Sequence, residues 1–414
     1  MKQLSLCMIA TGSDAQLKRC LDSTQGLVDE IIIVNMKPTD RISKLGQSYG
    51  AKVFDFYEEG GYPEAGNYAL EQATGEWVLW MHEDEQLDQN DRYRLRDLLY
   101  QEQCDLIFLN VLQYGFTING RTRILDMAVP RLFRSHFRFQ YFTEYQELLN
   151  YDQLKGTVKE PERVGIFPVK IHDYRLEKNP LQNKSNVLRE LDYLNRQPLT
   201  AGGQGQWYAY HLACEYYRLQ MYRPGFKHLN TAIQHYLDEK QLPPYIIYKL
   251  KYSVVLDEVI SEEIDHGLKL ALRMYPDYVD LQFYSGIVHY KKRMYEEALH
   301  HFSRCLELGE TPHGKYLIRK GMGSYQAAYY KGLCLEKLGE DDDSIRAFVE
   351  SLSYLSTFKP SLEALIRRLG EDAVLHELTY FWDHELPMER EELQSLLDTY
   401  LHDTGGMKSL GRVT

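Results

Sequence analysis

The hydrophobic positions of the first 81 residues fall into short runs, separated by segments with helical spacing. The runs have the length of strands, and the run EIIIVN is rich in β-branched side chains, as buried strands are. This pattern predicts strands at Leu4–Ala10, Glu30–Asn35, Ala51–Phe56 and Glu76–Met81. Strands that alternate with helices predict an α/β domain with a mainly parallel sheet covered on both faces.

Residues that favour helix ends mark the segments between these strands. Asp14 and Asp40 are expected to cap the first two helices, and Gly50 to end the second. Pro63 suits the first turn of a third helix. In parallel sheets, ligands bind beyond the carboxyl ends of the strands. The segments Thr11–Asp14, Asn35–Asp40 and His82–Glu85 should therefore lie together at a ligand site.

Beyond residue 100 the strand pattern is longer and less regular. Cys104–Leu112 predicts a strand, and Tyr114–Ile124 predicts a hairpin around Asn119-Gly120. Pro130–Arg134 and Phe139–Leu149 are expected to complete the domain.

From about Gln182 the hydrophobic period becomes helical. Gly286, Ala298 and Phe302 occupy the small-residue, alanine and phenylalanine positions of a tetratricopeptide repeat, whose period is roughly 34 residues. Neighbouring segments repeat this pattern at Ala213/Gly225/Leu229, Tyr252/Ile264/Leu268 and Gly332/Ser344/Phe348. Such repeats predict an all-α array, although unrelated helical hairpins could imitate it.

The resulting domain prediction has four parts. Residues 1–180 form the α/β domain, and residues 181–360 form the tetratricopeptide-like array. Residues 361–403 form a helical cap, because terminal repeats need a polar outer face. Residues 404–414 form a disordered tail.

Composition narrows the class of protein. The net charge of −12 argues against nucleic acid as a partner, because that binding requires clustered Lys and Arg. Six scattered cysteines without metal-site spacing suit buried thiols in a reducing cytoplasm. No apolar stretch reaches the roughly 18 residues of a transmembrane helix. We therefore expect a cytoplasmic protein.

Three stretches carry a resemblance to a known family: LSLCMIATGSDAQLKRCLDSTQGLVDEIIIVNMKPTDR, YGAKVFDF and NYALEQATGEWVLWMHEDE. They resemble bacterial family-2 glycosyltransferases, and most closely the subgroup with a C-terminal tetratricopeptide array that includes bacteriocin S-glycosyltransferases. The resemblance implies a GT-A fold and transfer of a sugar from a nucleotide-diphosphate donor, usually with Mn²⁺ or Mg²⁺.

The resemblance also places the metal site. Asp84 matches the family's metal-binding aspartate, and His82 stands where another aspartate is usual. A divalent cation would neutralise the departing diphosphate, and Mn²⁺ accepts both carboxylate and imidazole ligands. In an extended segment these two side chains would point the same way. The alternative is a solvated acidic loop without a ligand.

Other family positions are altered here. Thr11–Asp14 replaces an Asn-Glu pair, Asn35 replaces an aspartate, Gly66 replaces an arginine, and Gln146 replaces a histidine. The candidate donor-binding residues are Thr11, Asp14, Asn35, Asp40, Asn67 and Glu83.

Inverting transfer needs a carboxylate that accepts the proton of the acceptor. Glu147 is the first candidate because it matches the family's glutamate, and Glu85 is the second. Either could instead be a surface carboxylate. His172-Asp173-Tyr174 resembles a family segment that contacts the metal or completes the hydrogen bonding of the domain.

Two functions remain open at this point. One is an inverting, metal-dependent glycosyltransferase whose repeats recognise a protein, peptide or glycan acceptor. The other is a non-catalytic scaffold that keeps the fold but has lost the donor site. A nucleotidyltransferase is a third, weaker reading, since a Gly-rich, basic N-terminal loop is missing.

Overall fold

A computed structural model of the 414-residue chain describes residues 3–11, 13–57, 61–100, 104–118, 121–137, 139–141, 164–174, 188, 191–192, 206–219, 221–257, 262–310 and 316–370. The chain divides into two compact units. The first comprises residues 1–251 and 315–317, and the second comprises residues 252–314 and 318–414.

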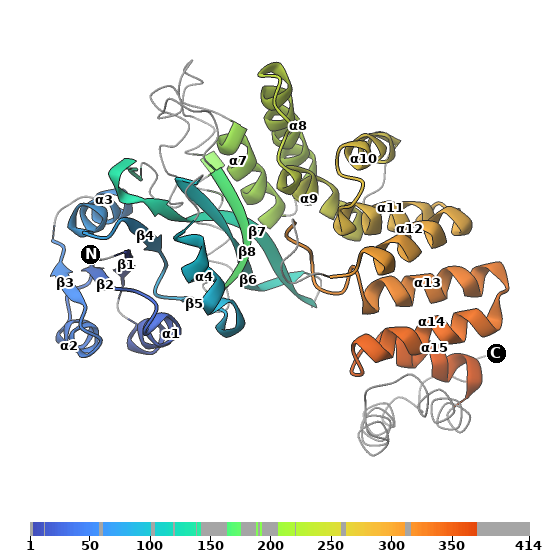
Figure 1. Ribbon diagram of the computed structural model, residues 1–414, viewed down its shortest axis with the longest axis horizontal. Helices are drawn as coiled ribbons and strands as arrows, with labels where there is room; N and C mark the ends of the chain where they lie inside the picture. The colour runs from blue at the N-terminus through green and yellow to red at the C-terminus, as the bar shows by residue number, and fades with distance from the viewer. Residues whose placement is uncertain are drawn as a thin grey trace. The chain divides into compact units, whose positions relative to one another are not determined.

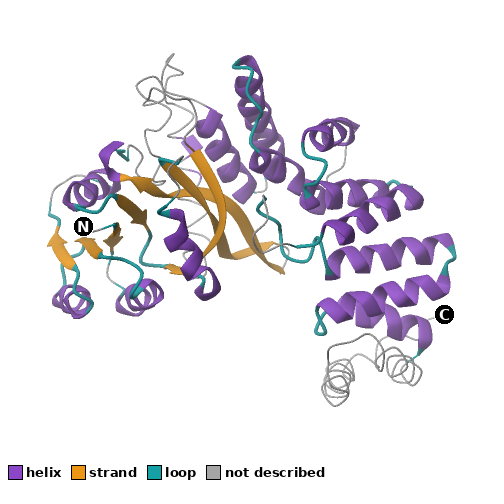
Figure 2. Cartoon of the chain, in the orientation of Figure 1, coloured by secondary structure: helices purple, strands orange, loops and turns teal. Residues whose placement is uncertain are grey.

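The first unit contains, in its described part, an eight-stranded sheet with the order β3-β2-β1-β4-β7-β6-β8-β5 (Figures 1 and 2). Strands β1 to β4 run parallel, β4 and β6 each pair antiparallel with β7, and β8 runs parallel to β6. The strands are β1 Leu4–Ala10, β2 Glu30–Asn35, β3 Lys52–Asp55, β4 Trp77–Trp80, β5 Glu85–Leu87, β6 Leu106–Ile118, β7 Arg121–Arg134 and β8 Val164–Asp173. The predicted α/β architecture is therefore confirmed.

Helices cover both faces of this sheet. Alternate residues of β1, from Leu4 to Ala10, pack with Leu17 and Leu21 of the first helix in one buried core. Cys7 points to the other face, where its thiol donates to the carbonyl of Ala69. Figure 1 accordingly shows α3 on the opposite side from α1 and α2. The helices of this part are α1 Asp14–Thr24, α2 Asp40–Ser48, α3 Tyr62–Gln72 and α4 Arg92–Leu98, with 3-10 turns η1 Gln89–Asp91 and η2 Ser135–Phe137.

The caps of the first two helices differ from the prediction by one residue. Ser13 stands at the N-cap of α1, and Thr39 caps α2 by accepting a hydrogen bond from the Ile42 amide at 3.4 Å. Asp14 and Asp40 instead lie in the first turns, where a carboxylate interacts favourably with the helix dipole. Gly50 ends α2 as predicted, at a φ of 74° that favours glycine.

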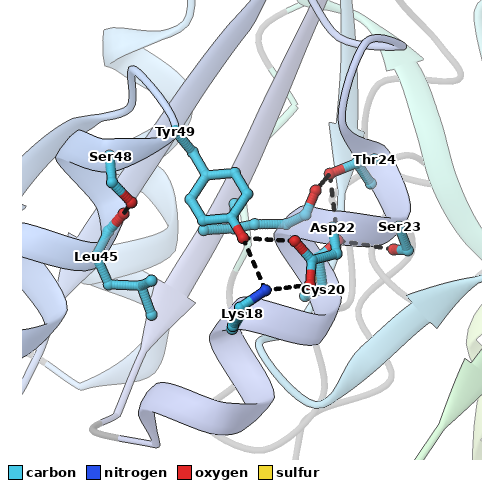
Figure 3. A network of polar contacts seen from close by, with 9 residues as sticks. Lys18, Cys20, Asp22, Ser23, Thr24, Leu45, Ser48 and Tyr49 are labelled. Atoms are coloured by element: carbon cyan, nitrogen blue, oxygen red, sulfur yellow. Dashed lines mark hydrogen bonds and ion pairs between the residues drawn. The ribbon is translucent and has the colours of Figure 1, made fainter.

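Helices α1 and α2 are joined by a polar network on their outer side (Figure 3). The Tyr49 hydroxyl donates to one oxygen of Asp22, and Lys18 Nζ lies 2.7 Å from the other. On the inner side of α1, the Ser23 hydroxyl accepts a hydrogen bond from the Leu87 amide at 3.1 Å. Helix α1 is therefore fixed against β5, directly after the acidic segment His82–Glu85.

The later strands are longer than predicted. Strands β6 and β7 form one hairpin, which includes the segment Pro130–Arg134. The predicted break after Leu112 lies beside a register shift between Gln113 and Phe116. A bulge of this kind interrupts the alternation of side chains without ending the strand. Strands β5 and β8 were not predicted, because β5 is only three residues long and needs β8 as its partner.

Three helices belong to the first unit although they follow the predicted boundary at residue 180. They are α7 Gln206–Arg218, α8 Tyr222–Asp238 and most of α9 Tyr245–Ser253. Lys249 of α9 forms an ion pair of 2.8 Å with Asp126 of β7, and both side chains are largely buried. The compact unit therefore extends to Lys251, whereas the four-part domain division stays a prediction.

The second unit consists of helical hairpins in its described part. Gly286 of α11 lies where an added Cβ would be 2.7 Å from the Phe302 ring of α12. Gly332 of α13 has the same relationship to Phe348 of α14, at 2.6 Å. Two neighbouring copies of the predicted repeat pattern therefore make the same contact. The elements are η4 Val254–Asp257, α10 Glu262–Met274, α11 Val279–Lys291, α12 Tyr295–Leu308, α13 Tyr325–Leu338, α14 Asp341–Tyr354 and α15 Lys359–Leu369.

Beyond residue 370, the predicted helical cap of residues 361–403 and the predicted tail at residues 404–414 lie outside the described residues. Across the described ranges, we find no helix with the length and apolar composition needed to cross a bilayer.

Candidate functional site

The carboxyl ends of β1, β2 and β3 lie side by side. Ala10 pairs with Asn35 in the sheet register, and Asn35 pairs with Asp55. Strand β4 lies on the other side of β1, and the Met81 amide donates to the Cys7 carbonyl at 3.2 Å. The structure therefore brings the three predicted loop segments to one edge of the sheet, where parallel sheets bind ligands.

Two of the candidate donor-binding residues are hydrogen-bonded to each other. The Thr11 amide donates to Glu83 Oε2 at 3.0 Å, and the Thr11 hydroxyl donates to Glu83 Oε1. The Glu83 side chain is buried, whereas Thr11 is exposed. This pair joins the loop after β1 to the loop after β4.

The acidic segment His82–Glu85 is a turn, so the expectation of an extended segment was wrong. The Glu85 amide donates to the His82 carbonyl at 3.0 Å, which closes the turn. The Glu85 carboxylate in return accepts a hydrogen bond from the His82 amide at 3.0 Å. These reciprocal bonds override the strand-like alternation that would have aligned His82 with Asp84. The metal assignment of these two residues remains a prediction.

The buried His82 side chain and the half-buried Asp84 side chain have different surroundings. The His82 ring lies 6.4 Å from the Tyr62 ring at the start of α3. The Asp84 carbonyl accepts a hydrogen bond from the Tyr174 amide at 3.3 Å, so the end of β8 supports the turn. Of the two residues, Asp84 is the more exposed, although its Oδ1 atom is buried.

Glu85, the second candidate for the catalytic base, is almost completely buried. Its Oε1 atom lies 2.6 Å from Nη2 of Arg131, whose side chain is also buried. A carboxylate held in such an ion pair faces no acceptor. Gln146 and the first candidate, Glu147, lie outside the described residues.

The carboxylates of the acidic turn act on the interior of α1. Burial raises the pKa of the Cys20 thiol well above its usual value, and the charges of Glu85, Glu83 and Asp84 raise it further. Cys20 is inside α1, so the effect of the three carboxylates reaches the core. A cation or a proton donor placed near this turn would be stabilised.

Asn35 lies at the end of β2 and is fully buried. Its Nδ2 atom donates to Asp55 Oδ1 at 3.1 Å, whereas its Oδ1 atom is a buried acceptor without a hydrogen-bond partner among the described residues. The sequence analysis missed Asp55, although a polar residue at the end of a strand is the same signal that identified Asn35. The exposed Asp55 carboxylate therefore belongs to the site's rim.

Asn67 has a different environment from the one expected for a donor-binding residue. Its Nδ2 atom donates to the Tyr141 carbonyl at 2.9 Å, and its Oδ1 atom accepts from the Tyr141 amide at 2.7 Å. At Gly66, an added Cβ would lie 3.1 Å from the Tyr141 ring, which packs on Trp80. Tyr141 therefore fills the space beside Gly66, where the family resemblance places an arginine.

The remaining candidates lie at helix starts. Asp14 is half-buried in the first turn of α1, and Asp40 is exposed in the first turn of α2. Both are near the carboxyl ends of the strands that precede their helices. Their roles in donor binding remain predictions.

The segment His172-Asp173-Tyr174 completes hydrogen bonding in the sheet. His172 Nε2 lies 2.9 Å from Asp88 Oδ2, and its Nδ1 lies 2.8 Å from the Tyr114 hydroxyl. Burial alone would raise the pKa of Asp88, but the bonds from His172 and the Asn90 amide outweigh burial and lower it. The geometry therefore fits the structural alternative for His172.

A divalent metal would depend on ligands beyond these side chains. Among the described residues, no group of three or more His, Cys, Asp or Glu side chains is arranged to hold a metal ion. Mg²⁺ commonly uses one or two carboxylates and takes its other oxygens from water and substrate phosphates. Asp84 fits that kind of partial site, which a donor diphosphate would complete.

Comparisons with known proteins agree with this architecture. The family model described as Glycosyl transferase family 2 matches residues 5–159. A TPR repeat-containing protein of Synechococcus elongatus is 27% identical over 275 residues, which cover 65% of this chain and 64% of the relative. An uncharacterized glycosyltransferase of Rickettsia typhi is 30% identical over 89 residues, which cover 22% of this chain and 30% of the relative. This chain thus spans less than two thirds of these relatives' lengths.

Two solved structures match parts of this chain at low similarity. TarS of S. aureus, residues 1–349, gives a TM-score of 0.36 at 14% identity, over 70% of this chain and 91% of that one. YrrB, a TPR protein with an unusual peptide-binding site, gives a TM-score of 0.35 at 14% identity, over 45% of this chain and 87% of that one. Because both scores are below 0.5, we transfer no property of either protein. The family match covers the N-terminal part of this chain, which therefore resembles family 2 glycosyltransferases and has an α/β sheet, and a helical region with tetratricopeptide-like contacts follows it.

Proposed function

We propose that this protein is an inverting, metal-dependent glycosyltransferase that moves a sugar from a nucleotide-diphosphate donor to a protein, peptide or glycan acceptor. The observation that carries the proposal is the acidic turn His82–Glu85 at the ligand-binding edge of the sheet, inside the region that matches the family. Reduced thiols at all six cysteines support a cytoplasmic location.

The donor's diphosphate would lie next to the acidic turn. Asp84, with His82 beside it in the turn, would hold Mn²⁺ or Mg²⁺ together with diphosphate oxygens. When bound, the metal would neutralise the charge that develops on the departing diphosphate. Burial raises the pKa of the Cys20 thiol, and the carboxylates of the turn raise it further, which supports a cation near the turn.

The nucleoside part of the donor would lie over the ends of β2 and β3. The Asn35 Oδ1 atom is an acceptor without a partner in the described part of the chain, so it can receive a hydrogen bond from the donor. Exposed Asp55, which pairs with Asn35 in the sheet, offers a carboxylate to hydroxyl or amide donors, as does exposed Asp40 in the first turn of α2. Thr11 lies in the loop after β1, at the same edge of the sheet, where Glu83 holds it through two hydrogen bonds.

We assign the proton-accepting carboxylate to Glu147. The alternative, Glu85, is buried in its ion pair with Arg131 and cannot approach an acceptor. Glu147→Gln should lower turnover by about 10²- to 10⁴-fold and leave donor affinity unchanged, since only proton transfer is lost. Equal turnover in the variant would exclude this assignment.

The helical repeats are the proposed acceptor-recognition region. Stacked helical hairpins create extended concave surfaces that suit peptides. The recurring glycine–phenylalanine contacts at Gly286 and Gly332 support a regular stack within the second unit.

Donor binding can be tested by thermal unfolding of the full chain with a panel of nucleoside diphosphates and nucleotide-sugars, with and without Mn²⁺. A ligand that binds only the native state, present at a free concentration of 100 times its Kd, stabilises that state by about 2.7 kcal/mol. We expect a shift that requires Mn²⁺ and that disappears in Asp84→Ala. Asp97→Ala, which removes an exposed aspartate of α4, is the matched control and should retain the shift.

The absence of any nucleotide-dependent shift would favour the second function, a non-catalytic scaffold that acts through its repeats. Two observations support that alternative. The Tyr141 ring takes the space beside Gly66, and Asn67 uses both polar atoms on the backbone of Tyr141. Sugar transfer that is lost in Asp84→Ala would exclude the scaffold function.

A further inference from the structure

A buried ion pair lies next to the acidic turn. Arg131 Nη2 and Glu85 Oε1 are 2.6 Å apart, and the two side chains are only 3% and 0% exposed. Burying two charges costs several kcal/mol per ion, and a well-packed apolar pair is often at least as stabilising. Stability alone therefore does not explain why these two residues are charged. Their ion pair instead fixes the geometry of the neighbouring turn.

Glu85 connects this pair to the backbone of the turn. While Oε1 is bound to Arg131, Oε2 accepts a hydrogen bond from the His82 amide at 3.0 Å. The Glu85 amide donates to the His82 carbonyl at the same distance. Because one oxygen of the Glu85 carboxylate is fixed, the other is held within hydrogen-bonding distance of the His82 amide. The turn is closed from both ends, and Asp84 lies between them.

Arg131 is itself held by the sheet. It lies in β7, one residue from Leu132, which pairs with Leu79 of β4. Strand β7 also pairs with β6 through Pro130 and Leu132, so Arg131 stands at a bulge between two paired residues. The guanidinium group is planar and always charged, so its direction is fixed more firmly than that of a lysine ammonium group. The rigid centre of the sheet is thereby connected to the turn that follows β4.

We propose that Arg131 is a positioning residue that acts through Glu85. It holds the turn His82–Glu85 in the one conformation that directs Asp84 toward the donor. The part that concerns the donor rests on the proposed function, whereas the part that concerns the conformation of the turn does not. Glu85 has the same positioning role and is not the catalytic base.

The conformational part is tested by amide hydrogen exchange, measured by mass spectrometry on peptides that cover residues 81–88. Arg131→Met should increase exchange at the His82 and Glu85 amides by about 10-fold or more, since both hydrogen bonds of the turn depend on the ion pair between Arg131 and Glu85. Arg134→Met is the matched control. Arg134 lies three residues further along β7, where it pairs with Glu76 and covers the Trp77 ring at the opposite end of β4.

Arg131→Lys is a second, milder variant, which keeps the test possible if the Arg131→Met protein does not fold. Lysine keeps the positive charge but lacks the planar guanidinium group, so amide exchange at the turn should lie between the wild-type and Arg131→Met values. Wild-type exchange of the turn in a folded Arg131→Lys or Arg131→Met protein would overturn the proposal.

The donor part is tested by calorimetric titration with a nucleoside diphosphate and Mn²⁺, at a temperature where every variant is folded. We expect Arg131→Lys to weaken binding by about 10-fold and Arg134→Lys to leave it unchanged. Faster amide exchange at the turn with unchanged nucleotide affinity would show that the ion pair between Arg131 and Glu85 does not position a donor ligand. If the wild type binds no nucleotide, the proposed function fails, while the exchange experiment still decides whether Arg131 holds the turn.

Discussion

Thr11 donates two hydrogen bonds to the carboxylate of Glu83, one from its amide and one from its hydroxyl. The residues are 72 positions apart in sequence, yet they join the loops that follow β1 and β4. Because the carboxylate accepts both bonds, it has less capacity left for a ligand. We therefore infer that Glu83 mainly holds Thr11 in place at the edge of the site.

Removing the Thr11 hydroxyl should weaken this connection. Thr11→Val is expected to reduce the free energy of unfolding by about 1.5–3 kcal/mol, the usual contribution of a hydrogen bond to a charged group. Denaturant unfolding of the two proteins measures the difference. Thr231→Val is the control, since the Thr231 hydroxyl bonds only to a carbonyl of its own helix at an exposed position, and it should change stability by less.

The contact between Asn67 and Tyr141 should also be important for stability. Asn67→Ala removes both hydrogen bonds and leaves the Tyr141 amide and carbonyl without these partners, at an expected cost of about 2–3 kcal/mol. Urea denaturation is a suitable measurement. Asn90→Ala, at an exposed position before α4, should have almost no effect. Equal stability of the Asn67 variant and wild type would show that the contact contributes little.

The close contact between Gly286 and Phe302 predicts a specific rescue. Gly286→Val should destabilise the second unit by about 1–3 kcal/mol, because its side chain would overlap the ring. Adding Phe302→Leu to Gly286→Val should recover part of this loss by removing ring atoms from the contact. Thermal unfolding of both single variants and the double variant gives the interaction energy. Strictly additive losses would mean that the two residues do not share the space.

His301 predicts an acid sensitivity of the second unit. Burial, and to a smaller extent the nearby charges of His289, His300 and Lys269, lower the pKa of His301 to about 4. In the neutral ring, one nitrogen can donate to Gln282 Oε1 at 2.8 Å and the other can accept from the Ser285 hydroxyl at 3.0 Å. Protonation would remove the acceptor that Ser285 uses.

The sign of the effect follows from proton binding. Between the ordinary value of 6.5 and about 4, the unfolded chain binds a proton that the folded chain refuses. Stability should therefore fall as the pH drops through this window, by at most about 3.5 kcal/mol, at about 1.4 kcal/mol per pKa unit. His301→Gln should flatten the pH dependence of the unfolding midpoint, whereas His266→Gln, at an exposed position of α10, should not.

Several elements could be predicted because they depend on local pattern. Strand β2 begins and ends where the run EIIIVN does, since its β-branched residues are buried on both faces of a parallel sheet. Gly286 and Phe302 were recognised through spacing alone, because the helical period places both on the inner faces of a hairpin. In contrast, β5 was missed, because three residues form a strand only when a distant partner such as β8 is available.

The candidate site was only partly predictable for the same reason. The order of strands and helices was sufficient to bring Thr11, Asn35 and the acidic turn to one edge of the sheet. The sequence did not reveal that the acidic segment is a turn, because that depends on the contact between Glu85 and Arg131 across 46 positions. Nor did it reveal that Asn67 bonds to Tyr141, 74 positions away.

The amino-acid sequence by itself determined the α/β class, the repeat array and the edge of the sheet that carries the polar residues. These features follow from side-chain periodicity and from the chirality of strand–helix–strand connections, which act over a few residues to a few tens of residues. Only the tertiary structure decided which polar atoms are already bound within the protein and which face the site. Hydrogen bonds and buried ion pairs form between residues that the fold brings together from distant positions, and their geometry is set by packing.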